Sequence, residues 1–328
     1  MTGVNQVLAD TGEVVVHIDQ TVARYSDLLY GTAIGVYAIA MLLLFAGYAA
    51  SLDRFAKQRP ARELAHVGGP VVSADDSGPG RVVPPEARSN SQRFVNMGYA
   101  VAVVGVLAQL GSIVTRGIAT DRMPWGNMYE FISLTMIACM VGGIVALRAP
   151  ANRKYLGFVT LAVVLMLFIG GKYLYTQAAP VVPALKSYWL MIHVSIISIS
   201  SGVLLVSGIA SMLFLLNNTF GIFGEQAADR LDRIAYRCVV FAFPLFGLGV
   251  ICGAIWAEAA WGRFWGWDPK ETVSFIAWVI YAAYLHARAT AGWRDKAAVI
   301  NIIGFVTLLF NLFAINLVVA GLHSYAGV

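Results

Sequence analysis

Apolar runs of roughly 20 residues recur along the whole of this 328-residue chain. Each run is long enough to cross a hydrocarbon layer about 30 Å thick. Backbone polar groups in lipid must bond internally, and barrel strands would alternate in polarity, so these runs must be helices. Only 12% of the residues are charged, which excludes an ordinary soluble domain, where about 25% are charged. We predict an all-α, polytopic integral membrane protein with about eight transmembrane helices, at residues 27–51, 94–114, 128–147, 155–171, 189–216, 235–256, 269–288 and 298–320.

Lysine and arginine are distributed unevenly between the two sets of connections that join these helices. Of the 23 basic residues, 16 fall in the connections 52–93, 148–154, 217–237 and 288–297, and seven fall elsewhere. The positive-inside rule places the basic connections in the cytoplasm, so both termini are expected outside. The pI near 9.1 comes from these inner loops and gives no indication of nucleic-acid binding.

The connection 52–93 is the one long link between predicted helices. Its Gly-, Pro- and Asp-rich composition around residues 68–85 is typical of a flexible segment. We expect residues 1–93 to comprise an outer N-terminal segment, the first transmembrane helix and a flexible inner linker, and residues 94–328 to form a seven-helix domain. The acidic start of the chain is unlike a cleavable signal peptide, so the first helix is expected to direct insertion. The three cysteines lie in apolar runs without CxxC spacing, which predicts buried thiols rather than a redox or metal site.

The predicted outer loop 256–271, between the sixth and seventh helices, contains four of the eight tryptophans. An interfacial aromatic belt is the ordinary alternative, but a belt spreads its aromatic residues over many helix ends. Four indoles so close together, interrupted by glycines, indicate a shaped platform that can stack on a flat apolar macrocycle. Asp268, Pro269 and Glu271 predict a capped, abrupt start of the next helix. The predicted platform consists of Trp256, Trp261, Trp265 and Trp267.

Two histidines from distant parts of the chain are expected at the same outer face as this loop. His193 lies about one turn into the fifth predicted helix, and His323 follows the eighth. Taken alone, each is also compatible with an interfacial histidine bonded to water or backbone. Neutral imidazole is the common axial ligand of haem iron. The pair beside an aromatic platform therefore predicts a haem site with two axial histidines.

His286 is expected at a different depth. It follows Pro269 by seventeen residues, which corresponds to about 25 Å along a helix from the outer end. A histidine near the inner boundary either snorkels to the headgroups beside Arg288 or has a function. A haem held by His193 and His323 is out of its reach, so iron binding by His286 requires a second, inner site. Two such sites would form a conduit, and the inner one has a single axial histidine or a ligand from a partner.

The stretch Trp261-Gly-Arg-Phe-Trp265-Gly-Trp267-Asp268-Pro-Lys-Glu271 is similar to the tryptophan-rich WWD signature of haem-handling cytochrome c assembly proteins. Other stretches resemble the CcsA (ResC) branch of that family, called CcsB in some bacteria. They are the flanking His193 and His323, the segment Asn127-Met-Tyr129-Glu130, and the helix containing Trp278, Tyr281 and Leu285-His286. The resemblance covers roughly residues 94–328.

The resemblance implies a function in cytochrome c biogenesis at the cell membrane. With a CcsB/ResB-type partner, as part of a holocytochrome c synthase, such a protein moves haem b to the extracytoplasmic side. There it presents haem to the CXXCH cysteines of apocytochrome c. By position, His193 and His323 resemble the outer axial ligands and His286 the inner one. The residues implied to contact haem are Trp256, Trp261, Trp265, Trp267, Asp268, Asn127, Tyr129 and Glu130.

The chain is expected to contribute orientation and iron ligation, while the porphyrin carries the reactivity. Glu130 and Glu258 are candidate proton donors or propionate contacts near the outer face. One alternative is a CcmC- or CcmF-like haem-delivery subunit, although a CcmC-like chain would be shorter. A cytochrome b would place histidine pairs inside the bilayer, whereas only His286 is expected at membrane depth. A solute transporter would show broken helices or an inverted repeat, and neither is visible in the sequence.

Overall fold

The structure is a computed structural model that describes residues 18–65, 89–317, 319 and 321–323. This part of the chain is helical and contains no strand, which confirms the predicted all-α fold. Two short 3-10 helices, Arg153–Tyr155 and Pro183–Leu185, accompany eight α-helices. The α-helices are α1 (Gln20–Ala65), α2 (Asn90–Thr120), α3 (Met128–Ala146), α4 (Leu156–Tyr173), α5 (Tyr188–Phe220), α6 (Glu225–Trp261), α7 (Pro269–Ala289) and α8 (Arg294–Leu317).

Seven of the eight described α-helices are long and apolar enough to cross a membrane. The remaining one, α7, has 21 residues, which also suffices for a crossing. Its mean hydropathy is lower because Trp278, Tyr281 and Tyr284 lie in its middle and its first turn carries Lys270 and Glu271. The chain is therefore a multi-pass membrane protein.

The helices extend beyond the apolar runs that predicted them. α1 continues to Ala65, so residues 52–65, expected in a flexible linker, are helical, and α2 already begins at Asn90. The rest of the predicted linker, residues 66–88, and the N-terminal segment 1–17 lie outside the described residues. The helices are longer than predicted because an apolar run marks only the part of a helix that lies in lipid. The backbone hydrogen bonds of the helix continue into the polar residues on either side.

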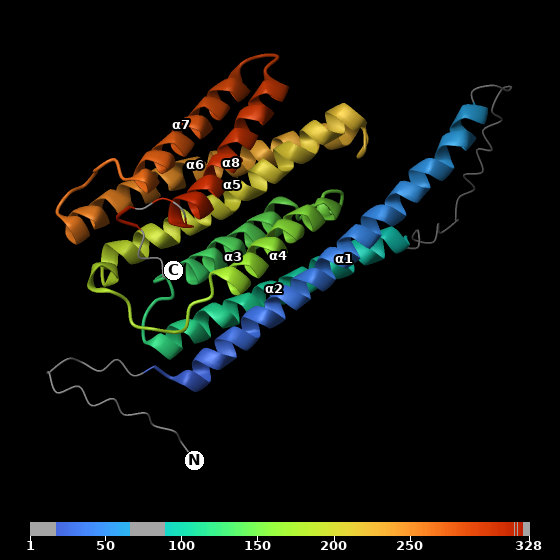
Figure 1. Cartoon of the computed structure of the whole chain (residues 1–328). Coiled ribbons are helices and arrows are strands. Elements are labelled where there is room, and N and C mark those ends of the chain that lie inside the picture. The colour runs from blue at the N-terminus through green and yellow to red at the C-terminus, as the bar shows by residue number, and fades with distance from the viewer. Residues whose placement is uncertain (1–17, 66–88, 318, 320, 324–328) are drawn as a thin grey trace, which may run out of the picture.

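The helices pack in two groups that meet at α3 and α5 (Figure 1). In the first group α1 lies along α2 and contacts α4, and α3 packs against α4. In the second, α6 lies along α5, and α7 along α8. One buried cluster, which includes Tyr37, Leu44 and Met136, fills the first group and continues into α5, α6 and α8. A smaller cluster, which includes Phe246 and Tyr281, lies within the second group.

Successive helices run in opposite directions, so their connections alternate between the two ends of the bundle (Figure 1). The tryptophan end, as we call it, holds the connections after α2, α4 and α6 and the described residues 321–323 after α8. The basic end holds the end of α1, the start of α2 and the connections after α3, α5 and α7. The start of α1 also belongs to the tryptophan end, because the Asp19 amide donates to the Ala119 carbonyl at 3.1 Å.

A buried charged network fixes the connection between α2 and α3 at the tryptophan end. The Glu130 side chain is 1% exposed and pairs with Arg116 (Nε to Oε1, 3.1 Å) and Arg122 (Nη1 to Oε2, 2.9 Å). Its Oε2 also accepts from the Gly126 amide at 2.8 Å. Asn127 caps α3 by accepting from the Glu130 amide at 2.9 Å. Glu130, a candidate proton donor or propionate contact in the sequence analysis, is therefore buried in an ion-pair network.

The same two arginines hold the segment between α4 and α5. Arg116 Nη2 donates to the Thr176 carbonyl, and Arg122 Nη2 donates to the Ala179 carbonyl at 3.1 Å. Tyr129 is buried beside them, and its ring centroid is 5.3 Å from the Arg116 guanidinium carbon. The network thus sets the positions of two connections that border the site described below.

We expect Glu130→Ala to destabilise the protein strongly, because it removes the carboxylate nearest to the buried Arg116 guanidinium. Breaking a buried ion pair from one side costs about 3–5 kcal/mol. The free energy of unfolding in detergent should fall by that order. The control Glu258→Ala, at an exposed position of the same end, should change it by less than about 0.5 kcal/mol. Equal stability of the two variants would contradict a structural role for the network.

Candidate functional site

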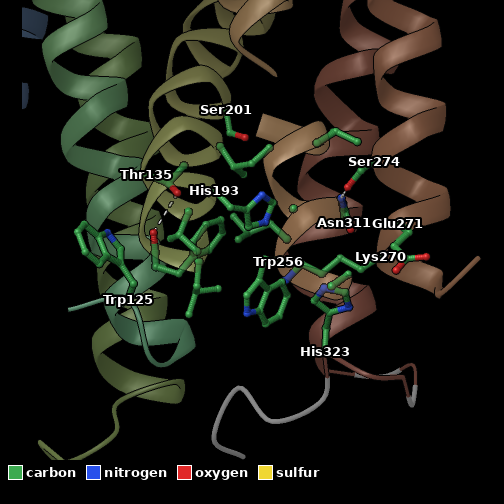
Figure 2. A pocket seen from close by; sticks show the side chains of 18 of the residues that line it. Trp125, Thr135, His193, Ser201, Trp256, Lys270, Glu271, Ser274, Asn311 and His323 are labelled. Atoms are coloured by element: carbon green, nitrogen blue, oxygen red, sulfur yellow. Dashed lines mark hydrogen bonds between the residues drawn. The ribbon is translucent and has the colours of Figure 1, made fainter. Parts of the chain in front are cut away.

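A cavity at the tryptophan end is lined by α3, α5, α6, α7 and α8 and by the segments before α3 and after α8 (Figure 2). Both His193 and His323 line it, although 130 positions separate them in sequence. Most of the wall is apolar or aromatic, with the rings of Trp125, Phe131, Trp256, Trp261, Phe264 and Trp265. Polar side chains line it both from α7 and α8 (Lys270, Glu271, Ser274 and Asn311) and from the residue before α3, α3 and α5 (Asn127, Thr135 and Ser201).

The tryptophans of the predicted platform occupy two different settings. Trp256 and Trp261 lie in α6, which continues past its predicted end and stops at Gly262, where φ is 72°. Trp256 is 2% exposed, and its ring centroid is 4.7 Å from that of Trp261. Trp265 lines the cavity, whereas Trp267 is 67% exposed, has a φ of 58° and packs edge-on against Trp265. Three of the four indoles therefore meet at the cavity.

His193 projects from α5 onto the backbone of α6. Its Nδ1 lies 2.7 Å from the Gly249 carbonyl oxygen. A carbonyl can only accept, so Nδ1 carries the proton and Nε2 keeps the lone pair. One turn further along α6 is Gly253, where a Cβ would lie 2.6 Å from His193 Cε1. A glycine at this position gives the imidazole its room.

His323 is held by Asp268, the residue that caps α7. Its Nδ1 lies 2.9 Å from Asp268 Oδ1, and Asp268 Oδ2 accepts from the Leu322 amide at 2.8 Å. The predicted capping box is confirmed, with Oδ1 accepting from the Lys270 amide and Glu271 Oε2 from the Asp268 amide, each at 3.1 Å. One carboxylate therefore connects the start of α7 to the segment after α8.

The pKa values of Asp268 and His323 favour an ionised carboxylate hydrogen-bonded to a neutral imidazole. Burial alone would raise the pKa of the Asp268 carboxyl, but hydrogen bonds from His323 and from the Leu322 amide outweigh burial and hold this pKa at about 2. Burial lowers the pKa of His323 below its usual value, and the nearby Asp268 carboxylate offsets this only in part. The ionised Asp268 thus accepts the Nδ1 proton of a neutral His323, which keeps the Nε2 lone pair that a metal ion requires.

Trp256 contacts the rings of both histidines. Its indole is nearly parallel to the His193 ring, with centroids 6.2 Å apart and planes inclined by 12°. The His323 ring meets the same indole edge-on at 5.8 Å, and it meets Trp261 at 5.1 Å. The fold therefore gathers two imidazoles of fixed tautomer and two indoles at one place.

The other predicted site residues are distributed around the fold. Asn127 lines the cavity, whereas Tyr129 and Glu130 belong to the buried arginine network. His286 lies in the last turn of α7, at the basic end, and is exposed. α7 runs from the tryptophan end to the basic end, so His286 lies at the opposite end of the bundle from His193 and His323, as predicted. The three cysteines are buried and unpaired, as predicted.

Sequence reasoning missed several residues that shape the cavity. Trp125 lines it from the segment before α3, where the sequence pattern indicates Asn127, two residues further on. Gly249 and Gly253 hold His193, and their four-residue spacing within an apolar helix is the known signal for close helix packing. Lys270 and Ser274 line the cavity one turn apart on α7, a spacing that places two side chains on the same face.

Comparison with known proteins shows which class of protein this cavity belongs to. The family model described as "Cytochrome C assembly protein" matches residues 125–323, which is more than half of the chain and includes both histidines. The chain belongs to the cytochrome c assembly protein family.

Within that family the chain is of the CcsA type and takes part in cytochrome c biogenesis. It is 32% identical to the cytochrome c biogenesis protein CcsA of Gloeobacter violaceus, over 70% of this chain and 86% of that one. It is 34% identical to CcsA of Microcystis aeruginosa, with the same coverages. CcsA of Chlamydomonas reinhardtii is 40% identical over 45% of this chain and 44% of that protein.

A solved structure of the cytochrome c haem lyase CcmF has a similar fold. Its TM-score is 0.62 at 14% sequence identity, and the match covers 95% of this chain. The chain spans about half of that longer protein, 49% of its length. At this identity the likeness concerns the fold, and it supports the arrangement of helices described above.

We expect Gly253→Ala to impair cytochrome c maturation, because the new methyl group would collide with the His193 imidazole. A displacement of about 1 Å at a site can cost about 100-fold in rate, and holocytochrome yield should fall by that order. The matched control is Gly35→Ala in α1, where a Cβ meets nothing within 4 Å. The measurement is the yield of covalently attached haem in cells that depend on each variant. Equal yields would show that the position of His193 is irrelevant to function.

Proposed function

We propose that the cavity at the tryptophan end binds haem b, with His193 and His323 as the two axial ligands. The observation that carries this proposal is the pair of imidazoles at one cavity, each with Nδ1 bonded to an acceptor, at Gly249 and Asp268. Such bonds fix the tautomer and strengthen the other ring nitrogen as a ligand. The indoles of Trp256, Trp261 and Trp265 line the same cavity, and flat aromatic surfaces suit a macrocycle.

The proposed role of the site is to present haem to apocytochrome c. Covalent attachment adds a cysteine thiol across a haem vinyl group, so the S–H bond breaks, one C–S bond forms and the hydrogen goes to the neighbouring vinyl carbon. The porphyrin and the thiol supply this reactivity. The protein contributes ligation, orientation and exclusion of water, and its gain comes from proximity.

The proposal extends to topology and partners. The distribution of basic residues favours a cytoplasmic basic end, so the cavity would open on the extracytoplasmic side of the cell membrane. We further propose that His286, exposed in the last turn of α7, takes haem near the cytoplasmic side. No second histidine accompanies it among the described residues of α6, α7 and α8 before His323. A CcsB/ResB-type partner would supply the missing ligand and complete a holocytochrome c synthase.

We expect His193→Gly and His323→Gly each to abolish holocytochrome formation and the haem absorption band of the protein purified with its partner. Each glycine leaves a gap of imidazole size, so added imidazole should restore part of both signals. The control Ser195→Gly places a glycine in the same helix at a position outside the cavity lining, and it should retain both. Normal maturation in both histidine variants would refute the site.

We expect Asp268→Asn to weaken haem binding while leaving the stability of the fold nearly unchanged. Asparagine and aspartate are similar N-caps, so α7 should still begin at the same residue. An amide has one oxygen, which cannot replace the carboxylate toward both His323 and the Leu322 amide. Changes behind a metal ligand typically cost about 10–100-fold in affinity. Haem titration and thermal unfolding of one preparation separate the two effects, and unchanged haem affinity would contradict the proposed role of Asp268.

A further inference from the structure

Two cations come together at the basic end, at the opposite end of the bundle from the cavity. Lys154 belongs to the 3-10 helix Arg153–Tyr155, between α3 and α4, and Arg230 lies in the second turn of α6. The Arg230 guanidinium is near enough to repel the Lys154 ammonium group, and both side chains are half-buried. Like charges held together away from water destabilise a fold unless an anion lies beside them.

The acidic residues that flank Arg230 in α6 are paired with a different cation. Asp229 and Asp232 both bind Arg294, at 2.7 Å and 3.2 Å. Within residues 18–65, 89–317, 319 and 321–323, neither Lys154 nor Arg230 forms an ion pair with a carboxylate. The fold therefore brings two positive charges together and directs the neighbouring negative charges elsewhere.

Unsatisfied polar groups gather around the same two cations. Arg230 Nε is buried and has no hydrogen-bond partner. The hydroxyl of Tyr155, a residue that is 1% exposed, adjoins Arg230 and is also unsatisfied. The hydroxyl of Tyr48 in α1 is a third such group, and the rings of Tyr48 and Tyr155 both pack on Phe223, at 5.5 Å and 5.4 Å between centroids. Buried donors are normally paired, so this cluster lacks an acceptor.

The donor set suits a phosphate group. Arginine and lysine are the usual cations that bind phosphate oxygens, and a tyrosine hydroxyl can donate to one as well. The ordinary alternative is that both cations snorkel to the headgroup layer. A snorkelling side chain keeps its polar head in water, whereas Arg230 Nε and the Tyr155 hydroxyl are buried.

The surroundings favour a phosphate that carries acyl chains. Phe220, at the end of α5, is 68% exposed, and Ile222, in the connection that follows, is 42% exposed. These apolar side chains stand beside Phe223, on which the two tyrosines of the cluster pack. Basic pockets between membrane helices on the cytoplasmic side bind anionic lipid headgroups.

We propose that Lys154, Arg230 and Tyr155 form a binding site for a phosphate group, presented by an anionic phospholipid or free in solution. The bound phosphate joins the 3-10 helix before α4 to the start of α6, at the end of the bundle where these segments lie together (Figure 1). The site is independent of the proposed haem site, because it contains neither His193 nor His323.

Lipid-dependent unfolding of the full chain in nanodiscs tests the proposal. The discs contain phosphatidylcholine alone or with increasing fractions of phosphatidylglycerol, and the readout is the fraction of phosphatidylglycerol that gives half of the rise in unfolding temperature. Arg230→Gln and Lys154→Gln each remove one cation, and Tyr155→Phe removes only the hydroxyl. The matched control Lys296→Gln removes an exposed cation of the same end. A parallel titration adds inorganic phosphate to discs of phosphatidylcholine alone.

We expect Arg230→Gln and Lys154→Gln each to weaken the response to phosphatidylglycerol by about fivefold, which is the contribution of one basic residue to binding an anionic lipid. Tyr155→Phe should weaken it as well, although it keeps both charges, and Lys296→Gln should respond like the parent. In phosphatidylcholine alone, Arg230→Gln should be at least as stable as the parent because it relieves the repulsion with Lys154.

Three results would overturn the proposal. They are an equal response to phosphatidylglycerol in Arg230→Gln and Lys296→Gln, a loss of stability in phosphatidylcholine alone as large as in the anionic discs, and a parent that responds to neither lipid nor phosphate. Stabilisation by inorganic phosphate that is lost in Arg230→Gln would support the site and identify the free anion as its ligand. A response to phosphatidylglycerol alone would identify the lipid.

Discussion

The Asp268 carboxylate is the interaction on which the geometry of the site depends. It begins α7, it binds the Leu322 amide, and it accepts the Nδ1 proton of His323. The described residues after α8, 319 and 321–323, are not helical, and these bonds hold Leu322 and His323 against the start of α7. The start of α7, the imidazole tautomer and the placement of His323 at the cavity are thus consequences of one ionised group.

The sequence predicts local features of this arrangement well and long-range ones poorly. The capping box from Asp268 to Glu271 was predictable because it needs only a fixed short spacing. The partner of His193 is a backbone carbonyl 56 residues away, and no side-chain pattern reveals a carbonyl. The end of α6 was placed too early because tryptophans at a membrane surface are typical of both a helix end and a loop. Gly262, in the left-handed region at φ 72°, is the residue that actually ends the helix.

Burial of charge was the other feature that pattern alone did not reveal. Glu130 follows Asn127 at the start of an apolar run, where a carboxylate is usually solvated. It is buried because Arg116, 2% exposed, requires an anion inside the bundle. Arg116 lies just past the predicted apolar run 94–114, in the part of α2 that continues to Thr120. The sequence therefore assigned it to a connection, and its pairing with Glu130 could be recognised only from the fold.

One helix links the two ends of the bundle chemically. α7 carries Asp268 and Lys270 at the tryptophan end and His286 in its last turn at the basic end. It packs along α8, whose following segment contains His323. One helix thus carries at its start the carboxylate that fixes the tautomer of His323 and in its last turn His286. The two positions proposed to hold haem are therefore placed relative to each other by the length and direction of α7.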